Sequence, residues 1–398
     1  MSKIMAVNSG SSTLKWKLYT VPDEKVIAKG MVDRLGLSDS VFEVQYNGKK
    51  ISEVGDIPNH TTAVNKMLDK LIDLKIIDDY KEINGVGHRV VAGGSIFKDS
   101  AIVTPRVIQQ IKNLSEFAPL HNPGQAAGIE AFEKILPDVP QVAVFDTSFH
   151  QTMDPVNYLY SIPYEYYEKY GVRKFGAHGT SHRYVSQAAA DYLQKPLADL
   201  KIISCHLGSG ASIDAIEDGK SVDTSMGFTP LAGITMSTRS GDIDPSLVAY
   251  LMQKMKITDP NEMVKILNTK SGLLGISGVS PDMRDLLATR KENHRSDLAI
   301  KIYINRIVKY IGSYIATLGG ADVLIFTAGT GAKNAEIRAD IVNRFNYRGI
   351  KIDKEANENG KGTRLISTKD STTDVLVVPT DEELMIVRDV VRLTKYSD

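Results

Sequence analysis

The sequence predicts an α/β fold built from two related halves. The segments KIMAVNSGSSTLKWKLY near the N-terminus and KIISCHLGSGASIDAIEDG near the middle each contain an apolar run, a Gly/Ser turn and a second strand-like run. Their turns align at an offset of 198 residues, which places Gly10 on Gly208 and Ser11 on Ser209. Strand-like and helix-like segments alternate elsewhere, as is typical of α/β architecture. We therefore expect each half to open with a hairpin.

Other elements follow from local signals. Asn122, followed by proline, predicts a helix to about residue 135, and Asp244, also followed by proline, begins another. Thr380 and the glutamate three residues later form a capping box for the last helix. The apolar runs 142–145 and 375–378 read as buried strands. We place the boundary between the halves near residue 150.

Composition excludes several classes of protein. Hydrophobic residues at 42% and charged residues at 24% are ordinary for a globular chain and exclude a wholly disordered one. The 48 basic and 48 acidic side chains cancel, which argues against binding to nucleic acid or to an anionic membrane. The single Cys205 excludes an intrachain disulfide, and no stretch approaches the ~18 apolar residues of a membrane span. Without a signal-peptide pattern, we expect a cytoplasmic enzyme.

Both Gly/Ser turns have the composition of an anion-binding loop. Glycine lets the backbone approach a ligand, and successive N–H groups and hydroxyls can surround a phosphate. The first turn offers Ser11 and Thr13 with Lys15 close by, and the second, at 206–212, adds a histidine. A plain hairpin turn explains either segment alone, whereas the repetition favours two loops that bind the two ends of a polyphosphate.

A third glycine-rich turn, AGTGAKN at 328–334, lies between a strand-like run and a helical pattern over about 333–346. Such a junction suits a phosphate or a nucleotide. It is no Walker A loop, because no Gly-Lys-Ser/Thr follows. As a dinucleotide fingerprint it is weak, since Asn334 stands where the third glycine belongs. Asp353 is still a candidate ribose acid, so an NAD-dependent oxidoreductase remains an alternative.

Two arginines and two acids are candidate ligand-binding residues. Arg89 and Arg239 lie among glycines or small polar residues, which suits bidentate binding of phosphate or carboxylate. Asp146 follows the apolar run 142–145, where a carboxylate could hold Mg²⁺ or simply cap a turn. Glu382 lies in the first turn of the last helix, where acids are favoured without any function.

Four histidines, His121, His178, His182 and His206, stand in polar or glycine-rich segments. The spacing of His178 and His182 could suit paired metal ligands, but Gly179 begins an apparent helix start and no HExxH glutamate is present. We therefore favour histidines that donate hydrogen bonds to phosphate over a zinc site.

The longer motifs, in chain order, are NSGSSTLKWKL, GHRVVAGG, APLHNPGQ, VFDTSFH, GAHGTSHRYV, HLGSGAS, TRSGDIDP, SGVSPDMRD, FTAGTG and PTDEELMIVRD. Together they resemble the acetokinase family, the acetate kinases, over nearly the whole chain. The resemblance implies the duplicated, ribonuclease H-like fold of the actin-like ATPase superfamily, with a cleft between two domains. It implies an acyl- and phosphate-binding domain at 1–150, joined by the C-terminal helix 384–398, and a nucleotide-binding domain at 151–383 that carries a homodimer interface.

The resemblance also implies roles for the matching positions. The catalytic residues are Asp146, His178 and Arg239, and the metal ligands are Asn8 and Glu382. The acyl substrate is bound by Arg89, Val91, Leu120, His121, Ala177 and Pro230. ATP is bound by Ser11, Thr13, Lys15, His206, Leu207, Gly208, Ser209, Gly210, Asp282, Met283, Arg284, Gly329, Thr330, Gly331, Ala332 and Lys333. The implied metal is Mg²⁺, with Mn²⁺ as a substitute, and ATP is a substrate.

Several positions depart from the family's usual residues. Ala177 stands in place of Phe, Ser209 in place of Asn and Ala92 in place of His; the usual GIGEN turn reads GTGAK, and the usual DFR reads DMR. The ionic residues are retained, so we expect phosphoryl transfer to be intact. Because Ala177 lacks a ring, we expect a larger acyl pocket.

These observations predict an Mg²⁺-dependent kinase. The expected reaction is reversible, in-line transfer of the ATP γ-phosphoryl group to acetate or a similar short-chain carboxylate, giving an acyl phosphate and ADP. A kinase that prefers propionate or butyrate is the nearest alternative. An NAD-dependent oxidoreductase and a non-catalytic actin-like ATP-binding protein are alternatives of other classes. The expected partners are small molecules and a second copy of the chain, without nucleic acid or membrane.

Overall fold

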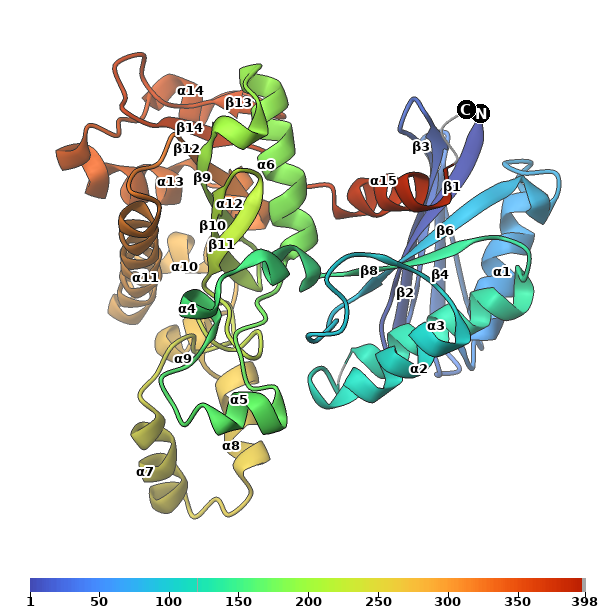
Figure 1. The fold of residues 1–398 in the computed structure, drawn as a ribbon, viewed down its shortest axis with the longest axis horizontal. Coiled ribbons are helices and arrows are strands. Elements are labelled where there is room, and N and C mark those ends of the chain that lie inside the picture. The colour runs from blue at the N-terminus through green and yellow to red at the C-terminus, as the bar shows by residue number, and fades with distance from the viewer. Residues whose placement is uncertain (120, 396–398) are drawn as a thin grey trace. The chain divides into compact units, whose positions relative to one another are not determined.

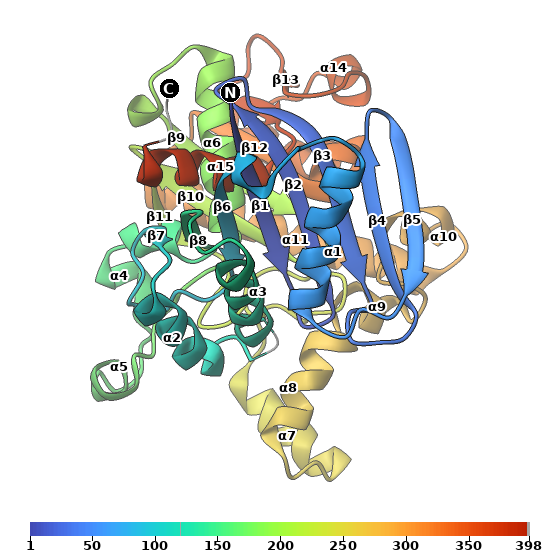
Figure 2. The same ribbon diagram turned by 90° about the vertical axis from the view of Figure 1, so that its right-hand side faces the viewer.

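The chain folds into two compact units, seen in a computed structural model that describes residues 1–119 and 121–395 (Figures 1 and 2). Unit 1 comprises residues 1–149 and the C-terminal residues from 381 onward, and unit 2 comprises residues 150–380. Residues 381–383, which we expected in the second domain, thus belong to unit 1.

Unit 1 contains an eight-stranded sheet in the order β5-β4-β3-β2-β1-β6-β8-β7. Its strands are β1 (Ser2–Ser9), β2 (Thr13–Val21), β3 (Lys25–Asp33), β4 (Ser40–Tyr46), β5 (Lys49–Gly55), β6 (Ile83–Val90), β7 (Ala101–Ile102) and β8 (Gln141–Phe145). The first five strands form an antiparallel meander, while β6 and β8 run parallel to β1.

Helices cover both faces of the central part of this sheet (Figure 1). One face carries α1 (His60–Asp73), α2 (Pro105–Asn113) and α3 (Asn122–Ile135), and the other carries α15 (Glu382–Thr394). The alternation of side chains along β8 explains this arrangement. Val142 and Val144 pack with α15, whereas Ala143 and Phe145 pack towards α2 and α3. A fully apolar strand of this kind is expected where both faces are buried.

Unit 2 contains a six-stranded sheet in the order β11-β10-β9-β12-β14-β13. Its strands are β9 (Lys201–Leu207), β10 (Ala211–Glu217), β11 (Lys220–Thr224), β12 (Val323–Thr327), β13 (Arg364–Leu365) and β14 (Asp374–Val377).

The two sheets share one topology. The orders β3-β2-β1-β6-β8 and β11-β10-β9-β12-β14 correspond strand by strand. In each, the first hairpin and the strand after it are antiparallel, and the next two strands run parallel to the first. The predicted duplication, and with it the α/β fold class, is therefore confirmed.

The hairpin β9–β10 has one polar and one apolar face. Ile203 and Cys205 belong to the hydrophobic core with α11 (His294–Leu318), while Ser204 and His206 point towards α6 (Gly179–Leu193). The remaining helices of unit 2 are α4 (Pro155–Tyr158), α5 (Glu165–Tyr170), α7 (Pro245–Met255), α8 (Pro260–Thr269), α9 (Gly272–Ser277), α10 (Met283–Thr289), α12 (Ala328–Lys333), α13 (Ala335–Val342) and α14 (Lys354–Glu358).

Three local predictions need correction. The glycine-rich turn at 328–334 is mostly the short helix α12. Asn122 is the first residue of α3 rather than its cap, and its side chain bonds to the backbone of Ala92 instead. Asp381, not Thr380, caps α15, by accepting from the Leu384 N–H group. The Asp244 cap is observed, with its carboxylate accepting from Ser246 N. No helix within residues 1–119 and 121–395 is long and apolar enough to cross a membrane.

Candidate functional site

The first glycine turn lies between β1 and β2. Gly10 N donates to Thr13 O at 2.7 Å, which closes the turn. Helix α3 reaches this turn because Gly124 has no side chain: a Cβ there would lie 2.7 Å from the Gly10 carbonyl carbon. Ser11 and Lys15 are exposed, and Thr13 and Asn8 are half-buried. The turn thus presents polar side chains in the place where we expected phosphate contacts.

Three strand ends and one helix start meet at a charged cluster in unit 1. Arg89, on β6, donates from Nη2 to Asp146 Oδ2 at 2.6 Å and from Nε to the same oxygen at 3.0 Å. Asp146 directly follows β8, and its own N–H donates to Val90 O. Glu382, at the start of α15, places Oε2 3.8 Å from Arg89 Nε. Asn8 joins them because the register of β1 on β6 pairs its neighbour Val7 with His88.

The pKa values of Arg89 and Glu382 in this cluster are both raised, but for different reasons. Asp146 raises the pKa of Arg89 above its usual value, against the opposing effect of burial. Burial raises the pKa of Glu382 to about 7; Arg89 opposes this rise, while Asp146 and the neighbouring acids of α15 add to it. The ionised form of Glu382 is therefore disfavoured in spite of the nearby guanidinium.

These residues fit a divalent cation. Asp146 and Glu382 offer two carboxylates and Asn8 an amide oxygen, the hard oxygen donors that Mg²⁺ prefers. The raised pKa of Glu382 indicates a place where additional positive charge is stabilising. No group of three His, Cys, Asp or Glu side chains within the described part of the chain forms a ready-made metal site, so a cation here would retain water or substrate oxygens as ligands.

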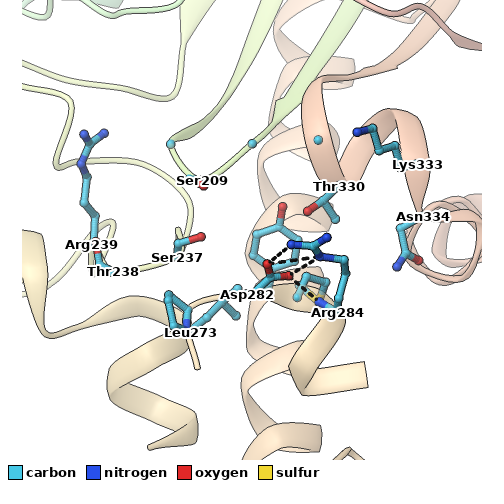
Figure 3. Close-up of a pocket in the computed structure, with 16 residues that line it drawn as sticks. Ser209, Ser237, Thr238, Arg239, Leu273, Asp282, Arg284, Thr330, Lys333 and Asn334 are labelled. Atoms are coloured by element: carbon cyan, nitrogen blue, oxygen red, sulfur yellow. Dashed lines mark hydrogen bonds and ion pairs between the residues drawn. The ribbon is translucent and has the colours of Figure 1, made fainter. Parts of the chain in front are cut away.

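Unit 2 contains a cavity of about 630 Å³ beside its glycine hairpin (Figure 3). Arg239 lies on one side of this cavity, with Thr330 and Lys333 on the other, and an Asp282–Arg284 ion pair lies between them. Ten of the expected ATP-binding and catalytic residues line it: Gly208, Ser209, Gly210, Arg239, Asp282, Met283, Arg284, Gly329, Thr330 and Lys333.

Four expected ATP-binding residues of unit 2 do not line this cavity. Leu207 and Gly331 are buried, and Ala332 packs against the core of unit 2. His206 is buried and bonds through Nδ1 to Ser181 Oγ at 2.8 Å. In this structure these positions support the cavity wall.

His178 and Arg239 converge on the glycine turn. A Cβ on Gly210 would lie 3.4 Å from both His178 Nε2 and Arg239 Nη1, so two polar side chains approach one point beside the cavity. His178 has a left-handed backbone with φ +59°, which is strained for a residue with a side chain and is typical of functional sites. Its ring stacks on His206 with centroids 4.2 Å apart.

The expected acyl-binding residues are distributed over both units. Val91 and His121 belong to unit 1, as does Arg89, whereas Ala177 and Pro230 belong to unit 2. Leu120 lies outside the described residues. Ala177 is buried in the core of unit 2, and Pro230 accepts a hydrogen bond from Arg239 through its carbonyl oxygen.

Sequence reasoning missed six residues that line the cavity: Ser237, Thr238, Leu273, Pro281, Tyr303 and Asn334. Four of them adjoin predicted residues, and extension of each motif by one or two positions finds them. Leu273 and Tyr303 lie on α9 and α11, where the apolar helical pattern signals only packing.

The chain matches the acetokinase family over residues 3–388. Similar curated proteins include the acetate kinase of Enterococcus faecalis, 58% identical over 99% of this chain and 100% of its own length. The acetate kinase of Fructilactobacillus sanfranciscensis is 57% identical over 98% of each chain.

Solved structures agree with these relatives. Porphyromonas gingivalis acetate kinase, 44% identical, matches with a TM-score of 0.95 over 99% of this chain and 100% of its own. A propionate kinase from Francisella tularensis, 38% identical, matches with a TM-score of 0.91 over 98% and 100%.

The duplicated sheets therefore have the actin-like ATPase fold, the fold of the acetate kinases. The chain belongs to the acetokinase family. The dinucleotide alternative is wrong. Asp353, the candidate ribose acid, has a structural role, as does Asn334 at the position of the missing third glycine. Asn334 caps α13 by accepting from Ile337 N, and Asp353 caps α14 by accepting from Ala356 N.

Proposed function

We propose that this chain transfers a phosphoryl group reversibly between ATP and acetate, with Mg²⁺ as the metal. The observation that carries the proposal is the convergence of His178 and Arg239 on Gly210 beside the glycine-lined cavity of unit 2. A cationic guanidinium and an imidazole at one point suit the equatorial oxygens of a phosphoryl group in transfer.

The acceptor requires no general base. A short carboxylic acid has a pKa of roughly 4–5, so it is already an anion at pH 7. The difficulty is the approach of this anion to a polyphosphate, which positive charge must relieve. Asp146, held on a guanidinium, positions the groups around it in this proposal rather than removing a proton.

Arg89 has the geometry of a carboxylate anchor. Its hydrogen bonds to the described residues use Nε and Nη2 and leave Nη1 for a ligand. Asp146 fixes the plane of the guanidinium, so the acceptor meets a preorganised donor.

Asp146, Glu382 and Asn8 would hold the metal, directly or through water. When bound, Mg²⁺ neutralises charge on the phosphoryl oxygens. Ser11, Thr13 and Lys15 are proposed to bind the phosphates from unit 1, and the lining of the unit 2 cavity is proposed to bind the nucleoside.

Hydroxylamine trapping of the acyl phosphate tests the reaction. We expect acyl hydroxamate from ATP, Mg²⁺ and acetate, together with thermal stabilisation by ATP·Mg²⁺ and none by NAD. Stabilisation by ATP without hydroxamate would instead support a non-catalytic actin-like ATP-binding protein.

The acyl preference is a second proposal. Ala177 stands where the family usually has phenylalanine, and the similar Francisella protein is a propionate kinase. One methylene in an apolar pocket changes discrimination by roughly 10–200-fold. We propose that propionate or butyrate is used as well as acetate. A wild type that strongly prefers acetate, together with the same preference in Ala177→Phe, would contradict the enlarged pocket.

We also propose that the enzyme is a cytoplasmic homodimer that associates through unit 2. Unit 2 exposes apolar side chains, including Val156 on α4 and Leu247 and Tyr250 on α7, a helix with no buried residue. Light scattering should give twice the mass of the chain, and Val156→Asp or Tyr250→Asp should lower it. A monomeric wild type would contradict the proposal.

A further inference from the structure

A continuous set of hydrogen bonds joins two serines and two histidines inside unit 2. His182, on α6, places Nδ1 2.9 Å from Ser204 Oγ and Nε2 2.8 Å from Ser212 Oγ. Ser212 Oγ lies 2.9 Å from His178 Nδ1 as well. The polar face of the β9–β10 hairpin supplies both serines. Ser204, His182 and Ser212 are fully buried, so water does not compete for their hydrogen bonds.

Ser204, the residue of this hydrogen-bonded series farthest from His178, fixes the direction of donation. Within the described part of the structure, the Ser204 hydroxyl has a single hydrogen-bond partner, His182 Nδ1. A buried hydroxyl without an acceptor is costly, so the Ser204 O–H group donates and Nδ1 accepts. Burial, with contributions from His150 and His206, holds the pKa of His182 well below its usual value, which keeps the ring neutral. Its single ring proton is therefore on Nε2.

Donation continues towards His178. His182 Nε2–H donates to Ser212 Oγ, so the Ser212 hydroxyl proton is directed to its other partner, His178 Nδ1. A neutral imidazole whose Nδ1 accepts carries its proton on Nε2. This is the nitrogen that, together with Arg239 Nη1, approaches Gly210.

We propose that His182, acting with Ser204 and Ser212, is a positioning residue that keeps His178 as a neutral Nε2–H donor at the glycine turn. The inference rests on the proposed function, in which His178 contacts the phosphoryl group. The set of hydrogen bonds moves no proton during the reaction. It excludes the tautomer that would present a lone pair to a phosphoryl oxygen, and the stack on His206 holds the plane of the ring.

Nuclear magnetic resonance of ¹⁵N-histidine-labelled full-length protein reads the tautomer directly. The chain has eight histidines, and the His178 signals are assigned by their loss in His178→Asn. We expect a protonated Nε2 and an unprotonated Nδ1 in the wild type. In Ser212→Ala we expect the other tautomer to appear and kcat to fall by roughly 10²-fold.

Ser186→Ala is the matched control. Ser186 is also a buried serine of unit 2, on the same helix as His182, but its hydroxyl donates to the Arg183 carbonyl group. We expect no change in the His178 signals or in kcat. A proton on Nδ1 of wild-type His178, or a Ser212→Ala variant with wild-type tautomer and kcat, overturns the proposal.

Two substitutions of His182 separate positioning from simple packing. Glutamine can place an amide N–H near the position of Nε2 and still donate to Ser212, whereas asparagine is too short. We expect His182→Gln to retain most of kcat and His182→Asn to behave like Ser212→Ala. If the two variants lose kcat equally and in proportion to a fall in melting temperature, His182 has a structural role only. If His178→Asn keeps normal kcat, the proposed function fails, while the tautomer is still measured independently.

Discussion

The two arginines of the site are held in opposite ways. Arg89, in unit 1, donates two hydrogen bonds to Asp146, and this carboxylate raises its pKa. Arg239, in unit 2, bonds to the Pro230 carbonyl oxygen and forms no ion pair with a carboxylate of the described residues, and burial lowers its pKa. A paired guanidinium is a fixed part of the protein, whereas a half-buried unpaired one gains most from an anionic ligand. The sequence context of the two arginines is similar, so only the structure separates these roles.

Arg239→Ala should show the largest effect on catalysis. We expect kcat to fall roughly 10³-fold or more, because an arginine that contacts the transferring phosphoryl group contributes this much in other kinases and GTPases. The free energy of unfolding should change little, since no buried carboxylate loses its partner. Steady-state kinetics and urea unfolding measure the two effects. Near-normal kcat, or a large loss of stability, would remove the contrast with Arg89.

Arg89→Met, in contrast, should strongly affect the stability of the protein. Asp146 is 1% exposed, and removal of the guanidinium from a buried ion pair costs about 3–5 kcal/mol of unfolding free energy at pH 7. The KM for acetate should rise as well. In the double variant Arg89→Met/Asp146→Asn the buried charge is absent, so stability should largely return while the acetate KM stays high. A single variant that is barely destabilised would show that the pair has no structural role.

Acidification should lower the stability of unit 1 by favouring protonation of His88, the residue before Arg89, rather than through Arg89 itself. His88 is buried beside Gln141 and Phe132, and burial lowers its pKa to about 4 although the bond to Gln141 opposes this. In the unfolded state His88 binds a proton near pH 6.5, whereas in the folded state it does so only near pH 4. The free energy of unfolding is therefore not reduced by this titration above pH 6.5, and it falls as the pH is lowered from 6.5 towards 4. Between pH 7 and pH 5 the loss should be about 2 kcal/mol.

Urea unfolding of wild type and His88→Gln at these two pH values measures the effect. The variant should lose less stability on acidification, since this titration is gone, while His182 in unit 2 still contributes. An identical pH dependence in the two proteins would contradict the assignment to His88.

The smallest effect concerns the cap of α15, the helix that brings Glu382 to Arg89. Asp381 accepts from Leu384 N and pairs with Lys17 at 3.3 Å. Asp381→Ala should cost about 1 kcal/mol by loss of the cap. Asp381→Asn keeps the capping oxygen and loses only the charge of a half-buried ion pair, so it should cost a few tenths of a kcal/mol. Equal losses would mean that charge rather than capping holds the helix.

The duplication, the hairpins and the glycine-lined cavity could be predicted because short motifs encode them. Gly10 and Gly208 mark turns that are visible in the sequence, and Arg239 adjoins the polar residues of the cavity wall. The capping residues were harder, because a polar side chain near a helix start can cap it or bond elsewhere. Thr380 bonds to Ser181, and Asn122 bonds to Ala92.

Contacts that depend on register could not be predicted. Ser204 and Ser212 look like ordinary strand residues, and their pairing with His182 arises only when the polar face of β9–β10 meets α6. The ion pair of Arg89 with Asp146 depends likewise on the parallel alignment of β6 and β8. Tyr303 reaches the cavity from a helix whose pattern indicates only a core.

The order of the chain has a consequence for biosynthesis. Unit 2 is inserted between β8 and α15, so the ribosome completes residues 150–380 before it makes the last helix of unit 1. Until Ile386, Val387 and Val390 emerge, the face of the sheet that carries Ile4 and Val142 has no cover. Unit 1, whose first residues are synthesised before unit 2, therefore completes its fold only after unit 2 has been made. Until then an apolar face of unit 1 stays exposed to chaperones and to misassociation, while unit 2 can already fold.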